Sequence, residues 1–100
     1  MILPDDLPYL RWALLKLLAS EGGGYWVADG TLMRALDKVG FGPSLDQTRS
    51  AMGWLADQGL VEMKTASGTR SAQLRQSGLD VVEGRCLVIG VKRPLHLELE

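Results

Sequence analysis

The stretch Ala51–Val61, AMGWLADQGLV, decides the fold of this chain. It begins as a helix, stops at a glycine and continues with an apolar pair. Glycine enters the left-handed backbone region without steric cost, so Gly59 predicts a helix end at which Leu60 folds back onto the last turn. The stretch therefore predicts a helix that leads directly into a strand at Val61.

The residues on either side of this stretch complete the helix and extend the strand into a β-hairpin. Upstream, Ser44 and Gln47 have the three-residue spacing of a capping box, which predicts where the helix begins. One side of this helix carries Leu45, Thr48, Met52 and Leu55. Downstream the apolar period changes to 2, with a turn at Ala66-Ser67-Gly68 between two short alternating strands. The inward residues of this hairpin are Val61, Met63, Ala72 and Leu74.

The rest of the chain supplies three further helices and one extended segment. A leucine stripe predicts a first helix that begins at Asp5-Asp6 and ends before Gly22. The aromatic and β-branched run Tyr25–Val27 indicates a short strand or an extended link. Asp29 is placed to cap a second helix, and Leu79–Gly84 indicates a short last one.

The order of elements is helix, short strand, helix, helix, hairpin, helix. This order predicts an α+β, mainly α fold: a winged helix-turn-helix with a three-helix core, a two-stranded hairpin as the wing and a short C-terminal helix. One hundred residues hold one such domain, which we assign to residues 1–91. Residues 92–100 are expected to form an extended tail, whose final Leu-Glu pair is typical of a cloning scar.

Charge and composition restrict the partners of this domain. The formal net charge is −1, whereas nucleic-acid-binding domains are usually markedly basic. Residues 1–60 carry five Lys/Arg and seven Asp/Glu, and residues 61–97 carry six and three, so an anion-binding surface is expected in the second half. The lone Cys86 excludes an intrachain disulfide, favours a reducing cytoplasm and is expected to be a small packing residue. No apolar run approaches the ~18 residues of a membrane span, so neither export nor membrane insertion is expected.

Two segments resemble winged-helix regulators of the ArsR- and MarR-like groups: Ser44–Val61, SLDQTRSAMGWLADQGLV, and Leu74–Gly84, LRQSGLDVVEG. A narrower resemblance is carried by Trp54-Leu55-Ala56, Gly59-Leu60-Val61, Gly78-Leu79-Asp80-Val81 and Gly90-Val91-Lys92-Arg93-Pro94. With these motifs the chain, from about Leu10 to Pro94, resembles a family of small uncharacterised proteins encoded in Mu-like phages and prophages. The resemblance implies a winged-helix fold and a phage setting, but it brings no activity and no catalytic residues. The wing turn Ala66–Arg70 is shorter and more polar here than in many members.

In a winged helix the third helix enters the major groove of DNA, so its outward side chains are the candidate base-reading groups. Glutamine and arginine read adenine and guanine edges, and basic side chains on the wing hold phosphates. The candidate DNA contacts are therefore Gln47, Arg49, Ser50, Lys64, Arg70 and Arg75. This set is small, and Asp46 and Asp57 on the same helix repel phosphate.

Two functions stay open on these observations. Our first hypothesis is a regulator of phage or prophage transcription that binds double-stranded DNA. The alternative is a winged-helix protein–protein interaction module in phage regulation or assembly, without direct DNA binding. The near-balanced charge and the aromatic residues favour the alternative, and the fold order favours the first.

Two tryptophans are candidates for a subunit contact. Trp54 projects away from the apolar side of its helix, where it either seals the core against the first helix or the hairpin, or contacts a partner. Trp12 lies off the leucine stripe of the first helix, which makes it the better candidate for a homodimer interface. The segment Gly90–Pro94 either contacts DNA, binds a partner or straps the domain.

No set of residues suggests catalysis, a metal or a cofactor. The single histidine, His96, and Cys86 lie ten residues apart and do not make a zinc site. Gly22-Gly23-Gly24 lacks the following Lys-Ser/Thr of a phosphate-binding loop. We therefore expect neither an enzyme nor a protein with a cofactor, a metal or a small-molecule ligand.

Overall fold

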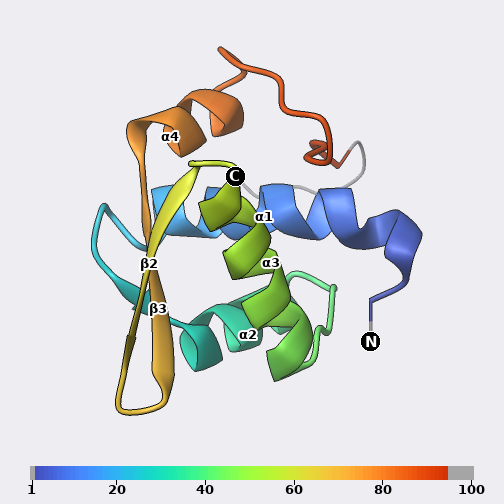
Figure 1. The fold of residues 1–100 in the computed structure, drawn as a ribbon. Coiled ribbons are helices and arrows are strands. Elements are labelled where there is room, and N and C mark those ends of the chain that lie inside the picture. Colours follow the sequence, from blue (N-terminus) through green and yellow to red (C-terminus); the bar gives the residue numbers. More distant parts are fainter. Residues whose placement is uncertain (1, 95–100) are drawn as a thin grey trace.

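The computed structural model describes residues 2–94, which form an α+β domain of four α-helices and one antiparallel sheet (Figure 1). A short 3₁₀ turn, η1 (Pro4–Asp6), precedes the first helix. The helices are α1 (Leu7–Ser20), α2 (Asp29–Lys38), α3 (Leu45–Asp57) and α4 (Gln76–Val82), and the strands are β1 (Val27–Ala28), β2 (Val61–Ala66) and β3 (Thr69–Leu74). The α+β class, with helix prevailing over strand, is confirmed. Among these helices none has both the length and the apolar character that a membrane crossing needs.

The sheet has the strand order β1–β3–β2. β2 and β3 pair along their whole length, and only Ser67 and Gly68 connect them. Both turn residues have positive φ, 51° and 77°, which is the conformation of a tight hairpin turn that follows the twist of its strands. The predicted two-stranded hairpin is confirmed, and of the two alternatives for Tyr25–Val27 the short strand is the one observed. Val27 pairs with Ala72, so the extended segment before α2 adds a third strand.

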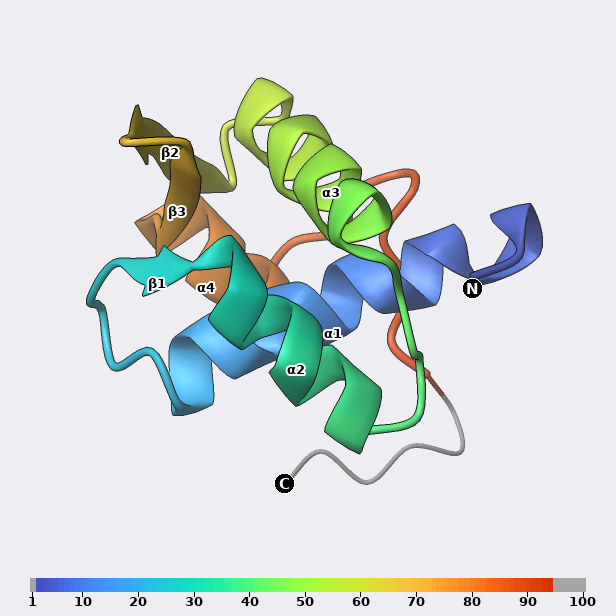
Figure 2. The ribbon, with the colours of Figure 1, turned by 90° about the horizontal axis from the view of Figure 1, so that it is seen from below.

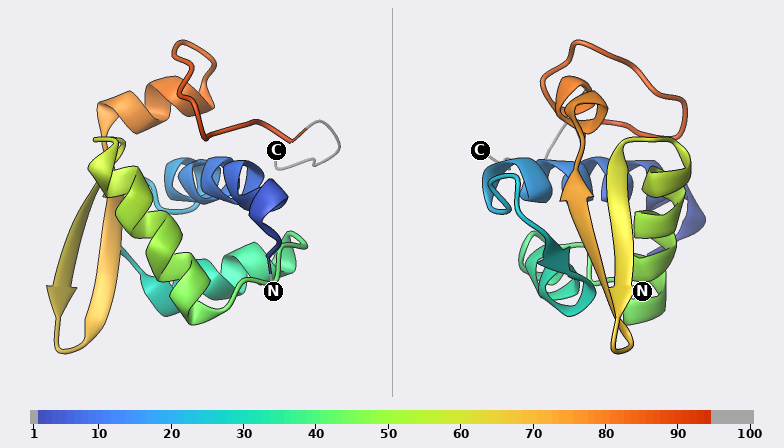
Figure 3. Two further views of the ribbon diagram at one scale, coloured as in Figure 1. Left: turned by 45° about the vertical axis from the view of Figure 1, so that its right-hand side comes forward. Right: turned by 60° about the vertical axis from the view of Figure 1, so that its left-hand side comes forward.

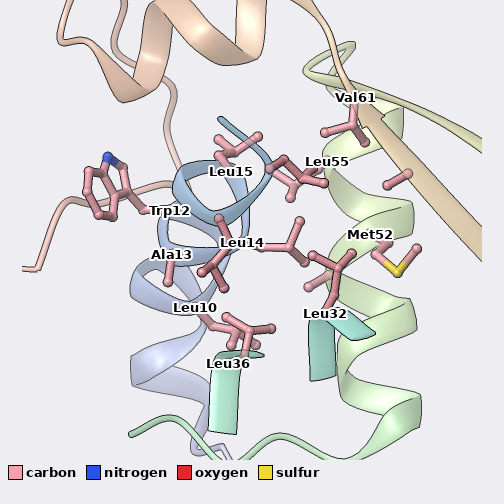
Figure 4. Close-up of a cluster of buried hydrophobic side chains, with 14 of the residues drawn as sticks. Leu10, Trp12, Ala13, Leu14, Leu15, Leu32, Leu36, Met52, Leu55 and Val61 are labelled. Atoms are coloured by element: carbon pink, nitrogen blue, oxygen red, sulfur yellow. The ribbon is translucent and has the colours of Figure 1, made fainter. Parts of the chain in front are cut away.

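α1 lies at the centre of the molecule and packs against α2, α3, α4 and β3 (Figure 2). Its buried residues cover most of the helix circumference: Leu10, Trp12, Ala13, Leu14, Leu15, Leu17 and Leu18. Figure 4 shows Leu10 and Leu14 among the side chains of α2 and α3 that form the centre of the core. The predicted leucine stripe is therefore one side of a helix that other elements cover from several directions.

Both ends of α3 have the predicted caps. At its start Ser44 Oγ accepts a hydrogen bond from Gln47 N (3.0 Å), and Gln47 Oε1 accepts one from Ser44 N (3.0 Å). At its end Gly59 has a φ of 75°, and Leu60 N donates to Leu55 O (3.0 Å) as in a Schellman motif. Leu55 and Leu60 are both buried, so the apolar contact of that motif is also present. The predicted passage from α3 straight into β2 is confirmed.

α4 lies over one side of α1 and is followed by Arg85–Pro94, a segment without helix or strand that we call the strap (Figure 3). The strap returns along α1, where Lys92 N donates a hydrogen bond to Pro8 O (3.0 Å). Of the three roles considered for Gly90–Pro94, the position across the domain is the one observed. The strap and the hairpin turn lie at opposite ends of the molecule in Figures 1 and 3. The expected scar at the chain end and His96 lie outside the described residues.

Candidate functional site

A buried carboxylate joins the start of α2 to α3 and to the hairpin. Asp29 is only 5% exposed. Its Oδ2 accepts hydrogen bonds from Arg49 Nε (2.7 Å) and Arg70 N (3.3 Å), and its Oδ1 accepts one from Gly30 N (2.7 Å). Arg49 Nη2 also donates to Gly68 O in the hairpin turn (3.3 Å). These bonds fix the hairpin against α3, and we call Asp29, Arg49, Gly68 and Arg70 the clamp.

The clamp keeps Asp29 in its charged form. The hydrogen bond from Arg49 is the main reason that the pKa of Asp29 lies below its usual value of 3.8. The main-chain amides of Gly30 and Arg70 lower this pKa further, and burial of the carboxylate acts in the opposite direction. The donors outweigh desolvation, so the buried carboxylate stabilises the fold as an anion.

The sequence predicts that Asp29 caps α2. In the structure the N-cap residue is Ala28, and Asp29 is the first residue of the helix. Spacing carries the signal for its buried position, because Asp29, Leu32 and Leu36 follow at three and four residues on one helix face, and all three are buried. An acidic residue on the buried face of a helix predicts a cationic partner from another element.

Two of the predicted base-reading side chains are bonded inside the chain. Gln47 closes the cap of α3, and its amide also bonds both main-chain groups of Ile2, with Oε1···N at 3.2 Å and Nε2···O at 3.1 Å. Arg49 is held by Asp29, and its side chain is 26% exposed. Each group would have to give up an existing hydrogen bond before it could bond a base edge, which makes both poor readers of DNA.

Two of the predicted wing cations contact neighbouring side chains: Lys64 on the outward face of the sheet, and Arg75, which directly follows β3 and caps α4. Lys64 Nζ lies 4.3 Å from the centre of the Trp26 ring, which is a cation–π contact. Arg75 Nη1 lies 3.2 Å from Glu62 Oε1, and both side chains are about half exposed. This face of the sheet therefore combines both signs of charge with an aromatic ring.

The remaining predicted DNA contacts, Ser50 and Arg70, are exposed on α3 and on β3. Asp46 and Asp57 are exposed on the same helix as Ser50, so the outer side of α3 carries two negative charges. The structure brings Arg49 and Arg70 together at the clamp but builds no continuous basic surface from the predicted set. Across residues 2–94, His, Cys, Asp and Glu side chains nowhere gather in the threes that would hold a metal ion.

Trp54 packs between α1 and the strap. The guanidinium carbon of Arg11 lies 4.0 Å from the centre of the Trp54 ring, and Arg11 Nη1 donates to Gly90 O (3.1 Å). Gly90 lies directly on the ring, since an added Cβ would come within 2.6 Å of it. The interpretation that Trp54 seals the core edge against the first helix is confirmed, and the strap, rather than the hairpin, completes this seal.

Trp12 faces the opposite side of α1 from Met52 and Leu55, as Figure 4 shows. It is only 6% exposed, and the guanidinium of Arg93 on the strap lies 5.7 Å from its ring centre. Trp12 therefore lies off the leucine stripe, as expected, but it is buried because the strap covers this side of α1. Its predicted role in a homodimer interface stays a prediction.

A cleft of about 680 Å³ lies between α1, α4 and the strap. About half of its lining surface is apolar, contributed by side chains that include Trp12, Val81, Val82, Leu87, Val88 and Val91. Its rim also carries charged side chains, Lys16 on α1 and Glu83 after α4. It is larger than the hollow of about 300 Å³ beside Trp26 and Leu32.

Beside this cleft, Cys86–Ile89 forms an exposed apolar segment that we call the ridge. Leu87 is 95% exposed and Ile89 is 99% exposed, while Val88 between them packs against the core. Cys86 is exposed as well, so its predicted role as a packing residue is wrong. Val88 is thus the only one of these four side chains that is turned toward the core.

The fold and these surfaces define a small α+β domain with an exposed apolar ridge beside a cleft. A relative places the chain in a family. The chain is 41% identical over 66 residues to the uncharacterized protein gp26 of Escherichia phage Mu, and these residues make up 66% of this chain and 69% of the relative. The chain belongs to this family of Mu-like phage proteins. No protein-family model matches the sequence.

Proposed function

We propose that this domain is a winged helix. The order helix, strand, helix, helix, hairpin, helix supports this assignment, as does the pairing of β1 with the hairpin in one small sheet. In this assignment α3 is the recognition-type helix, and β2, β3 and their turn are the wing. The clamp at Asp29 then holds the wing in a fixed position against α3.

We further propose that the protein is a protein–protein interaction module of Mu-like phages, without enzymatic activity. The ridge carries this proposal, because Leu87 and Ile89 are almost fully exposed beside a cleft of about 680 Å³. An exposed apolar patch next to a hollow is typical of a binding surface, since covering aliphatic side chains lowers their free energy in water. The cleft accepts apolar side chains, and the ridge supplies the contact area around it.

The outer side of α3 supports this choice over DNA binding. Gln47 and Arg49 are bonded within the chain, and the exposed charges of α3 are Asp46 and Asp57. Binding to a DNA backbone is driven by several Lys/Arg that displace counterions. The described part of α3 offers one arginine, which already neutralises Asp29.

Selection of peptides from a displayed random library tests the interaction function. We expect the selection to yield peptides that bind the wild-type protein. These peptides should bind the double variant Leu87→Glu/Ile89→Glu at least about tenfold more weakly, because a carboxylate is costly to transfer into an apolar contact. Tyr25→Glu is the matched control, since Tyr25 is 78% exposed on a different surface and its variant should bind the peptides normally. Failure to enrich any peptide, or equal binding to the double variant, would exclude the ridge as the binding surface.

A regulator that binds double-stranded DNA is the second candidate function. Ser50 and Arg70 favour it, because both are exposed on the elements that would meet the groove and the backbone in a winged-helix complex. It predicts duplex binding that weakens with salt and depends on Arg70. The acidic residues of α3 would then lie close to phosphates, and for this reason we place it second.

A further inference from the structure

The strap buries little of its own apolar surface. Leu87 and Ile89 are 95% and 99% exposed, and Val88 and Val91 are only partly buried against the core. The strap contains neither helix nor strand, so no ladder of main-chain hydrogen bonds holds it to α1. Low apolar burial and sparse main-chain bonding are the properties of segments that open without unfolding of the whole domain.

The core of the domain is complete without the strap. All buried apolar residues between 2 and 94 precede the strap, and the last of them is Val81 in α4. α1 packs against α2, α3, α4 and β3, so these elements hold α1 in place whether or not the strap lies on it. Lifting the strap would therefore uncover Trp12 and Trp54 and leave the contacts between the helices and the sheet intact.

The start of the strap is fixed to α4. Arg85 N donates a hydrogen bond to Asp80 O (2.8 Å), and Arg85 Nη2 lies 2.7 Å from Asp80 Oδ1 and 2.7 Å from Glu83 Oε1. Gly84, at which the chain leaves α4, has a φ of 80°. Arg85 thus stays with α4, and residues 86–94 are the part of the strap that can swing away.

A latch of Arg11, Trp54 and Gly90 holds the strap on α1. The Arg11 guanidinium stacks on the Trp54 ring at 4.0 Å and donates from Nη1 to Gly90 O (3.1 Å). Arg11 Nε is buried and donates to no acceptor in the described part of the chain, and burial lowers the pKa of Arg11 below its usual value. A buried donor without an acceptor costs free energy, and water reaches it once the strap lifts, so the latch holds the strap weakly.

We propose that residues 86–94 form a gate that opens as one unit about Arg85 while the rest of the domain stays folded. In the open form the hydrogen bond from Lys92 N to Pro8 O is broken and the Arg93 guanidinium leaves the Trp12 ring. The indole rings of Trp12 and Trp54 are then exposed where the strap lay. The opening is a property of the chain by itself and does not depend on the proposed interaction function.

The gate controls the cleft. Leu87, Val88 and Val91 of the strap form one wall of the cleft, opposite Trp12 on α1 and Val81 on α4. Opening therefore abolishes the cleft and carries the ridge away from it, and closing rebuilds both. A partner that binds ridge and cleft together binds only the closed form, so its binding shifts the population toward that form.

Amide hydrogen exchange of the wild-type protein in increasing urea tests the gate. The amide of Lys92 reports opening, because its acceptor, Pro8 O, lies on α1, and the amide of Leu14 within α1 reports unfolding of the domain. We expect the Lys92 amide to be protected at least about 100-fold less than the Leu14 amide. Its exchange should also be nearly independent of urea at low concentration, because opening exposes little surface. Equal protection and equal urea dependence of the two amides would overturn the gate.

Gly90→Ala opens the gate, and Gly84→Ala is its matched control. Both glycines have positive φ, 97° and 80°, so alanine is strained at both, but only the Cβ at position 90 would meet the Trp54 ring. We expect the Lys92 amide of Gly90→Ala to exchange at least about tenfold faster than in the wild type, because overpacking disfavours the closed form. Acrylamide should quench its tryptophan fluorescence more strongly, as Trp12 and Trp54 become accessible, while its far-UV circular dichroism stays unchanged. Gly84→Ala should match the wild type in Lys92 exchange and in quenching, because residue 84 stays with α4 in both forms.

Two results for Gly90→Ala would contradict the gate. Quenching and Lys92 exchange equal to those of the wild type would show that the latch does not hold the strap. Loss of the helical circular dichroism, with Gly84→Ala still folded, would show that strap and core form one cooperative unit.

Discussion

Replacing Gly78 with alanine is expected to lower the free energy of unfolding by about 3 kcal/mol. Gly78 is buried in α4, where an added Cβ would collide with the main-chain oxygen of Leu60 and lie 2.7 Å from Leu74 Cδ1. The Leu60 oxygen already accepts a hydrogen bond from Arg75 N (3.1 Å), so this part of the backbone does not move aside without cost. Alanine is the better helix former by about 1 kcal/mol, which is too little to offset the collision. Urea unfolding followed by circular dichroism measures the change.

Gly53 in α3 is the matched control, because it is a helical glycine with open space around it. No atom lies within 4 Å of the position of its added Cβ. Gly53→Ala should therefore raise the free energy of unfolding by about 0.5–1 kcal/mol, through helix propensity and a less flexible unfolded chain. If alanine changes the free energy of unfolding in the same direction at Gly78 and at Gly53, then α4 does not pack directly on the junction of α3 and β2.

Replacing Asp29 with alanine is expected to cost about 3 kcal/mol, because the clamp loses its acceptor. Arg49 Nε and the main-chain amides of Gly30 and Arg70 would each lose a bond to a charged oxygen. Since the carboxylate is 5% exposed, water reaches these donors poorly after the change. Thermal unfolding measures the stability, and faster amide exchange at Gly68 and Arg70 would show that the hairpin turn is released.

Asp29→Asn separates the charge of Asp29 from its shape. The folded-state pKa of Asp29 is lowered, so its contribution is fully present above the usual pKa of 3.8 and is lost as the pH falls through the folded value. The wild type should therefore exceed Asp29→Asn in stability at pH 6, and this difference should shrink below about pH 4. Asp57→Asn, at an exposed position of α3, is the control for the loss of one negative charge. A constant difference down to pH 2 would contradict a charged clamp.

The helical elements were predictable because their signals are local. The capping box of Ser44 and Gln47 and the stop at Gly59 depend on residues within a few positions, and both appear as expected. The hairpin followed from the change of period after Leu60. β1 was harder to predict, since two residues become a strand only because Ala72 lies opposite Val27.

The surfaces of the molecule depend on contacts between residues that are far apart in the sequence. The periodicity of apolar residues carries no information about such contacts. Trp12 lies off the leucine stripe, and it is buried because the strap, some 80 residues later, returns over it. Asp29 binds Arg49, twenty residues away in the sequence, so a residue expected to read DNA became part of the clamp. Cys86 reads as a packing residue from its small apolar side chain, and it is exposed because Val88 is the residue of the ridge that packs against the core.

Titration of a fluorescently labelled duplex of about 30 base pairs, in about 50 mM salt, tests most directly whether this domain binds protein rather than DNA. With its α3 side chains bonded inside the chain, the protein should leave the anisotropy of the duplex unchanged up to about 50 µM, where even non-specific DNA-binding proteins bind. Saturable binding in that range, weakened by salt and lost in Arg70→Glu, would contradict the interaction module and establish the DNA-binding alternative.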